Sequence, residues 1–189
     1  MIEDDDNDDV LANDVAYARS LASRNDLTDE DLWNLSSPSM LTDRVIRAAE
    51  NALKAQYGCH GLQDTALGQT LSFKASNSQP FVQILFDGCV HWVAVTNFGC
   101  KTDEIILLDS NIRVYGKGRN RRARVNGHLQ EQICNIMNTE SKHITIHIER
   151  VQQQINGFDC GLFAVANVQY ILRHKRYEKN LYFPIFPSL

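Results

Sequence analysis

The chain has 189 residues, of which 43% are hydrophobic and 22% charged, and its formal net charge is −4. This is the composition of a globular protein, and it excludes a wholly disordered chain. A chain of this length forms one domain, or one domain with a tail, and it buries enough surface to fold without disulfides or a structural metal. Its apolar runs fall short of the roughly 18 residues that a membrane span needs. Acidic residues follow Met1 in place of a basic leader, so we expect an intracellular protein of the nucleus or cytoplasm that has no membrane partner.

The cysteine pattern agrees with a reducing compartment. The five cysteines are odd in number, and no two of them form a CxxC pair. Without a secretory signal, we expect all five to be unpaired. The nearest approaches to metal-ligand spacing are Cys59 with His60 and Cys89 with His91, and neither pair has a partner motif. We therefore predict neither a metal site nor a cofactor.

Charge is distributed unevenly along the chain. Residues 1–31 carry eleven acidic and two basic residues, and the remainder has a net charge of +5. The segment 1–25 is interpreted as a disordered acidic arm that either solubilises the protein or competes with an acidic partner for its basic body. Residues 113–124 hold six basic and no acidic residues, which suits a solvated loop, a nuclear localisation patch or a contact for an acidic surface. Because no aromatic residue follows Tyr115 in this loop, we expect no specific nucleic-acid partner.

The first predicted element is a helix. Apolar residues recur at helical spacing from Leu41 to Leu53, Ser39 or Thr42 can cap its start, and Gly58 can end it. The other predicted elements are, in chain order, strands at 81–86, 90–96 and 104–109, a helix starting near 127, a strand at 143–148 and a helix at 159–174. This order predicts an α+β fold, in which helices pack around a central sheet.

The predicted domain limits follow from these elements. Residues 26–180 form the folded domain, between the acidic arm and an apolar tail at 181–189. Pro184 and Pro187 exclude a helix in that tail, so we expect an extended segment laid over the body.

The stretch QINGFDCG at 154–161 points to chemistry. Asn156-Gly157 is a turn signal, and Cys160 follows it at the predicted start of a helix. Unpaired N–H groups and the helix dipole favour the thiolate there. Gly161 lets another chain approach the sulfur closely. Position alone leaves both a nucleophile and a buried structural cysteine open.

A nucleophilic cysteine needs a base, and the base needs a group that orients it. Among the six histidines, His91 stands out because it opens an apolar strand directly after a turn. Asp109 ends the following strand, so two neighbouring strands can bring these residues to one edge of a sheet. Each residue also has a plain structural interpretation, as a strand-end histidine and as a turn-forming acid.

The order of His91-Trp92, Asp109 and QINGFDCG resembles that of the ubiquitin-like-protein-specific cysteine proteases. These enzymes process and deconjugate the modifier SUMO and its relatives, and the adenoviral protease is a distant cousin. Residues 31–43, DLWNLSSPSMLTD, match a further family pattern, so the resemblance runs from about residue 27 to 175. It implies a permuted papain-like fold with a central mixed sheet and the nucleophile at a helix N-terminus.

The resemblance also implies a role for each matching residue. Cys160 is the nucleophile, His91 the base and acid, and Asp109 the group that orients the imidazole. Gln154 and the backbone N–H of Cys160 stabilise the oxyanion. Water then hydrolyses a thioester, and no cofactor is implied.

Substrate-binding residues are implied in the same way. Trp92 matches an indole that covers a narrow tunnel for a Gly-Gly tail, and Asp43 matches an acid that meets a basic residue of the modifier. Met40 departs from the family, where tryptophan is common. Gly161 completes the predicted substrate contacts, and we expect Trp33 to pack in the core.

The partner implied is a ubiquitin-like modifier or its conjugates, bound by a monomeric enzyme. Three alternatives remain open. The first is a protease of the same fold that cuts a mobile-element or other polyprotein. The second is an acetyltransferase that uses the same site, with an inositol phosphate bound at loop 113–124. The third is a non-catalytic module that binds ubiquitin-like proteins.

Overall fold

The computed structural model describes residues 27–59, 61–76, 79–112, 114–115, 122–138 and 143–176. The predicted acidic arm, the apolar tail, His60 and most of the basic loop lie outside these ranges.

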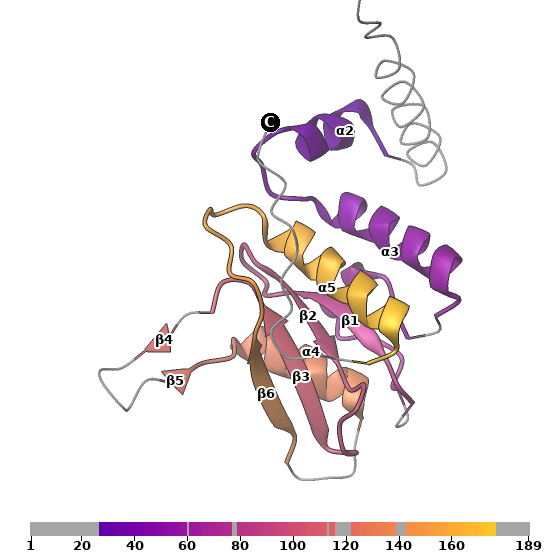
Figure 1. Ribbon diagram of the computed structural model, residues 1–189, viewed down its shortest axis with the longest axis vertical. Coiled ribbons are helices and arrows are strands. Elements are labelled where there is room, and N and C mark those ends of the chain that lie inside the picture. The colour runs from indigo at the N-terminus through magenta and orange to yellow at the C-terminus, as the bar shows by residue number, and fades with distance from the viewer. Residues whose placement is uncertain are drawn as a thin grey trace, which may run out of the picture.

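A four-stranded mixed sheet forms the centre of the molecule (Figure 1). Its strands, in spatial order, are β1 (Val82–Phe86), β2 (Trp92–Thr96), β3 (Glu104–Asp109) and β6 (Thr145–Arg150). The first three strands are antiparallel neighbours, whereas β3 and β6 run parallel, with Asp109 opposite Arg150. A separate small ribbon pairs β4 (Val114–Tyr115) with β5 (Arg122–Ala123). The predicted mixed sheet is confirmed.

Helices cover both faces of the sheet. The α-helices are α2 (Asp29–Ser36), α3 (Asp43–Tyr57), α4 (Gly127–Met137) and α5 (Cys160–His174), and a short 3-10 helix, η1, spans Thr65–Gly68. Helices α3 and α5 lie on one face and α4 on the other (Figure 1). Thr42 caps α3 by accepting the N–H of Val45, and Gly58 ends the helix with a φ of 60°, as the sequence predicts.

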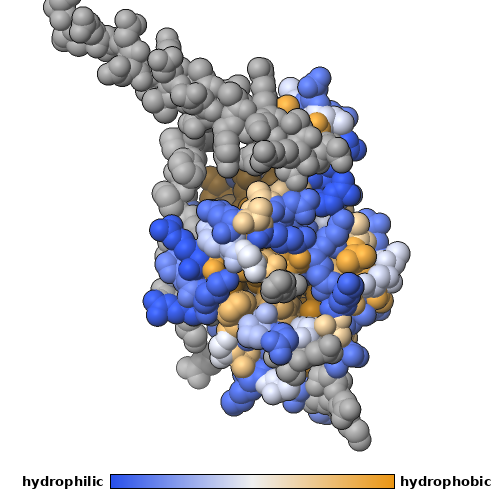
Figure 2. All heavy atoms as spheres, turned by 90° about the vertical axis from the view of Figure 1, so that its right-hand side faces the viewer, coloured by the Kyte–Doolittle hydropathy of each residue, from blue (hydrophilic) through white to orange (hydrophobic). Residues whose placement is uncertain are grey.

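Alternating strand residues divide the core into two clusters. Ile84, Ala94 and Leu108 face α3 and α5, whereas their neighbours Leu85, Val93 and Leu107 face α4. This alternation is the period of two that a strand imposes on its side chains. On the outer surface, hydrophobic residues gather near the middle of the face that lies on the right of Figure 1, with hydrophilic residues around them (Figure 2).

Several details differ from the sequence predictions, among them the start of β2 at Trp92 and not at residue 90. Trp33 does not pack in the core: its side chain is 64% exposed, because the short helix α2 turns Asp31 inward to bond Thr28 and Thr42. The last strand begins at Thr145, two residues later than predicted, because its pairing with β3 starts opposite Glu104.

The described residues contain neither a membrane-spanning helix, nor a metal-binding cluster, nor a disulfide. No described helix is long and apolar enough to cross a membrane. Within the same ranges, no three His, Cys, Asp or Glu residues gather where they could hold a metal ion. All five cysteines are described, and each carries a free thiol.

Candidate active site

Cys160 is the first residue of α5 and is fully buried. The turn before it is built by Asn156, whose Oδ1 accepts the N–H groups of Phe158 and Asp159 while its Nδ2 donates to Asp159 Oδ2 at 2.6 Å. This folds the chain tightly enough for the helix to begin at the cysteine. The sulfur lies 4.0 Å from the carbonyl oxygen of Val90, the residue before His91.

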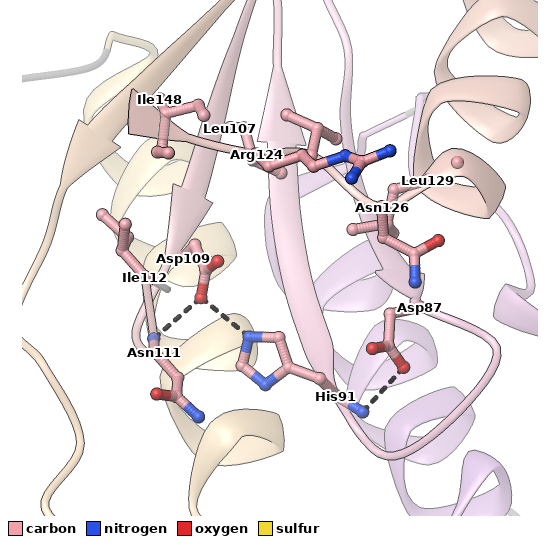
Figure 3. A pocket seen from close by; sticks show the side chains of 13 residues that line it. Asp87, His91, Leu107, Asp109, Asn111, Ile112, Arg124, Asn126, Leu129 and Ile148 are labelled. Atoms are coloured by element: carbon pink, nitrogen blue, oxygen red, sulfur yellow. Dashed lines mark hydrogen bonds and ion pairs between the residues drawn. The ribbon is translucent and has the colours of Figure 1, made fainter. Parts of the chain in front are cut away.

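His91 and Asp109 meet at one edge of the sheet, as their places in the sequence predict. The turn before β2 is held by Asp87, whose Oδ1 accepts three consecutive N–H groups, the last from His91 at 2.9 Å. The imidazole Nε2 lies 2.7 Å from Asp109 Oδ1, which also accepts the N–H of Asn111 (Figure 3). Because Nε2 faces the carboxylate, Nδ1 is the nitrogen left to exchange a proton with Cys160.

The imidazole of His91 is held in its charged form. Burial alone disfavours the cation, but the hydrogen bond and charge of Asp109, together with the side chain of Cys160, outweigh burial and raise the pKa of His91 to about 9. Cys160 acts on this pKa as a hydrogen-bond partner of the ring as well as through its charge. The cysteine, histidine and aspartate therefore form one electrostatic unit at the start of α5.

The carboxamide of Gln154 is fixed at both ends. Its Oε1 accepts a hydrogen bond from the Ser110 hydroxyl at 2.8 Å, and its Nε2 donates to the Asn156 carbonyl at 2.7 Å. An amide nitrogen carries two hydrogens, so one N–H stays available for a ligand. The sequence analysis does not single out Ser110. Its place directly after Asp109 puts it near the site, but nothing in the sequence pairs it with Gln154.

Met40, Trp92 and Asp43 line one cavity of about 400 Å³. Trp92 is buried, its Nε1 donates to the Leu41 carbonyl at 3.1 Å, and its ring lies 4.7 Å from that of Phe86. The indole is thus fixed as one wall of the cavity. Met40, the position where the family often has tryptophan, is half-buried beside it.

A second cavity, of about 280 Å³, lies beside His91 and Asp109 (Figure 3). Asp87 and Asn126 make part of its wall polar, whereas Leu107, Leu129 and Ile148 make another part apolar. Cys160 does not line it.

Gly161 is buried against the segment that precedes α3. A Cβ at this position would lie 3.0 Å from the Cβ of Leu41 and 3.2 Å from Ile46 Cδ1. Because Gly161 has no side chain, Leu41 and Ile46 can pack closely against it. Its predicted contact with substrate stays a prediction.

These features define a class of protein. An α+β fold that presents a cysteine at a helix N-terminus, next to a histidine bonded to an aspartate on the sheet, is that of a papain-like cysteine protease.

Comparison with known proteins identifies the family. The model of the Ulp1 protease family, C-terminal catalytic domain, matches residues 74–185, more than half of the chain, and this protein belongs to that family. It is a cysteine peptidase. No curated protein matches the sequence.

Solved structures share the fold at low sequence identity. The SUMO protease Ulp1 with its catalytic cysteine oxidised to a sulfinic acid is 16% identical, with a TM-score of 0.57 over 78% of this chain and 73% of that one. The Ulp1 protease domain in complex with Smt3, the yeast orthologue of SUMO, is 16% identical, with a TM-score of 0.51 over 77% and 71%. The Xanthomonas campestris effector XopD bound to ubiquitin is 13% identical, with a TM-score of 0.50 over 73% and 76%.

Proposed function

We propose that this protein hydrolyses the peptide or isopeptide bond after the C-terminal Gly-Gly of a ubiquitin-like modifier. The observation that carries the proposal is the position of the Cys160 sulfur at the start of α5, beside an imidazole whose opposite nitrogen binds Asp109. Family membership supports the peptidase activity, and the relatives bound to Smt3 and to ubiquitin support the class of substrate.

The first half of the proposed reaction forms a thioester. The Cys160 thiolate attacks the carbonyl carbon of the terminal glycine, and the carbonyl oxygen becomes an oxyanion. The free N–H of Gln154 and the backbone N–H of Cys160 stabilise it, and losing one such donor typically lowers kcat by about 10²–10³. His91 then donates its Nδ1 proton to the leaving amine, and the C–N bond breaks.

The second half releases the modifier. Neutral His91 takes a proton from water, and the hydroxide attacks the thioester carbon. The C–S bond breaks and the thiolate returns beside the imidazolium. Asp109 keeps the ring oriented through both halves, because its bond to Nε2 holds Nδ1 toward the sulfur.

The cavity lined by Met40 and Trp92 is the proposed path of the Gly-Gly tail. Glycine suits a narrow path because any Cβ would collide with the walls. Methionine in place of an indole leaves this wall flexible, since the thioether side chain adapts to its neighbours. We therefore expect weaker discrimination against a substituted tail than an indole at this position would give.

A panel of ubiquitin-like modifiers, each with an electrophile at its C-terminus, tests the proposal. At least one should form a covalent adduct with the wild type and with Cys134→Ala, which removes an exposed thiol on α4, but not with Cys160→Ala. The same modifier, carrying a fluorogenic amide, should be hydrolysed. Absence of both labelling and hydrolysis across the panel would overturn the proposal, and acetyl transfer in its place would favour the acyltransferase alternative.

Met40→Trp tests the path of the tail. We expect this variant to raise the preference for a Gly-Gly over a Gly-Ala tail by about tenfold in kcat/KM, the size of effect that one small group in a pocket can give. Unchanged selectivity would contradict the assignment of this cavity.

A further inference from the structure

Ser110 is bound to Gln154 through both its side chain and its backbone. The residue follows β3 directly and is 2% exposed. Its hydroxyl donates to Gln154 Oε1 at 2.8 Å, and its carbonyl accepts the Gln154 N–H at 2.8 Å. One buried residue therefore fixes both the backbone and the side chain of Gln154.

The parallel pairing of β3 and β6 explains why these residues meet. Asp109 lies opposite Arg150 at the ends of the two strands, so both chains leave the sheet in the same direction. Gln153 links the segments that follow β3 and β6. Its Nε2 donates to the Asp109 carbonyl at 2.9 Å, and its Oε1 accepts the Ile112 N–H at 3.1 Å. Gln154 then meets Ser110 on a backbone that is already held.

The hydrogen bonds also define which end of the Gln154 amide is the donor. Reversing the amide would set its oxygen against the Asn156 carbonyl, at the 2.7 Å now occupied by a donated hydrogen bond. Two acceptors at that distance repel each other, so Nε2 stays on the side of the turn that precedes Cys160. A hydroxyl donating to Oε1 also polarises the amide, which makes its remaining N–H a stronger donor.

We propose that Ser110 is a positioning residue that aligns and polarises the Gln154 amide for the oxyanion of the reaction. This inference rests on the proposed function, because it gives the Gln154 N–H a role only if an oxyanion forms at Cys160. The Ser110 side chain acts on the rate through Gln154 alone.

The test is a double-mutant cycle in the whole 189-residue chain. Hydrolysis of a ubiquitin-like modifier with a C-terminal fluorogenic amide is measured for the wild type, Ser110→Ala, Gln154→Ala and the double variant. We expect Ser110→Ala to lower kcat about tenfold, as small misplacements of catalytic groups do, with KM changed less than twofold. In the Gln154→Ala background, the same substitution should have almost no further effect.

Two control variants separate positioning from stability. Thr96→Val also removes a buried hydroxyl from the sheet, one that donates to the Phe81 carbonyl at 2.8 Å at the far end of β2 from His91, and it should keep the wild-type kcat. Ser110→Thr keeps the hydroxyl and should remain within about threefold of the wild type. Labelling of Cys160 by a modifier whose electrophile is a vinyl sulfone forms no carbonyl oxyanion, so Ser110→Ala should label at the wild-type rate, which also shows that it is folded.

Three results would overturn the inference. The first is a wild-type kcat in Ser110→Ala. The second is an equal loss of kcat from Ser110→Ala with and without Gln154. The third is a loss of labelling that matches the loss of hydrolysis. A wild type that neither labels nor hydrolyses any modifier would instead overturn the proposed function, and this inference with it.

Discussion

Two titratable side chains that lose water on folding, the partly buried His91 and the fully buried Glu50, have opposite charge preferences. Both lose water on folding, and water is what stabilises an ionised group. His91 has the Asp109 carboxylate 2.7 Å away and keeps its charge, with a pKa raised to about 9. Burial raises the pKa of Glu50, in the middle of α3, well above the usual carboxyl value, which favours its uncharged form.

The hydrogen bonds around the two groups also differ: those at His91 favour the charged form more strongly than those at Glu50 do. Glu50 Oε1 accepts a hydrogen bond from Gln83 Nε2 at 3.2 Å, and this bond, the Thr65 backbone and the Lys54 charge lower the pKa less than burial raises it. At His91, the turn built by Asp87 and the carboxylate of Asp109 fix both the backbone and the ring. A shifted pKa by itself therefore does not mark catalysis. What distinguishes His91 is a fixed counter-charge on one nitrogen and a thiol at a helix start on the other.

Among the variants that test this comparison, we expect Asp109→Asn to have the largest effect on activity. The variant keeps the shape but removes the counter-charge, so His91 loses both its orientation and the stabilisation of its cation. We expect kcat/KM to fall about 10³–10⁴-fold in the fluorogenic assay. Asn126→Ala, which changes another residue that lines the cavity beside His91, serves as a control and should retain most of the activity. A loss of less than tenfold in Asp109→Asn would contradict the role of the carboxylate.

The pH dependence of kcat/KM gives the next largest effect. Because the leaving group takes its proton from the imidazolium, activity should persist up to about pH 9 and then fall about tenfold per pH unit as His91 loses its proton. Removing the carboxylate in Asp109→Asn should move this fall to lower pH. A profile that stays flat to pH 10.5 would contradict the ion pair.

The same pKa predicts a change in stability. The ordinary pKa of a histidine is 6.5 and the pKa of folded His91 is about 9, so the stabilisation that its cation gains on folding is fully present below about pH 6.5. That stabilisation is lost progressively as the pH rises through 9. Denaturant unfolding of wild type and Asp109→Asn between pH 6 and 10 should therefore show two curves that converge at high pH. Parallel curves would argue against the raised pKa.

Glu50→Gln gives the smallest expected effect and tests the other half of the comparison. Because the folded pKa of Glu50 is raised, the wild type loses stability as the pH rises above the usual carboxyl value, and glutamine does not ionise. The unfolding free energy of the variant relative to the wild type should increase with pH, by up to about 1.4 kcal/mol per pH unit within that window. Activity should not change. A pH-independent difference between the two proteins would show that Glu50 does not carry the shift.

Local pattern made the positions of the main site residues predictable, whereas their roles were implied only by the family resemblance. The cysteine after a turn signal marked the helix start, and the apolar strands after Asp87-Gly88 and before Ser110 placed His91 and Asp109 at neighbouring strand ends. Antiparallel pairing of β2 and β3 then brought the two residues together. Helix α3 was predictable from its apolar spacing and its caps.

Other features had no such pattern. The bond between Ser110 and Gln154 joins residues 44 positions apart and depends on the parallel pairing of β3 and β6, which periodicity does not reveal. Trp33 was predicted to pack in the core. In a two-turn helix the orientation is instead decided by the Asp31 hydrogen bonds with Thr28 and Thr42, which turn the indole to solvent.

The two tryptophans lie in contrasting environments, so intrinsic tryptophan fluorescence can report on the cavity beside Met40. Trp92 is 4% exposed and forms a wall of the cavity beside Met40, while Trp33 is 64% exposed on α2. An indole in water emits at longer wavelength than one surrounded by side chains, so the native spectrum should contain a red and a blue component. Trp33→Phe would leave one emitter, and its intensity would follow the filling and emptying of that cavity during single turnovers.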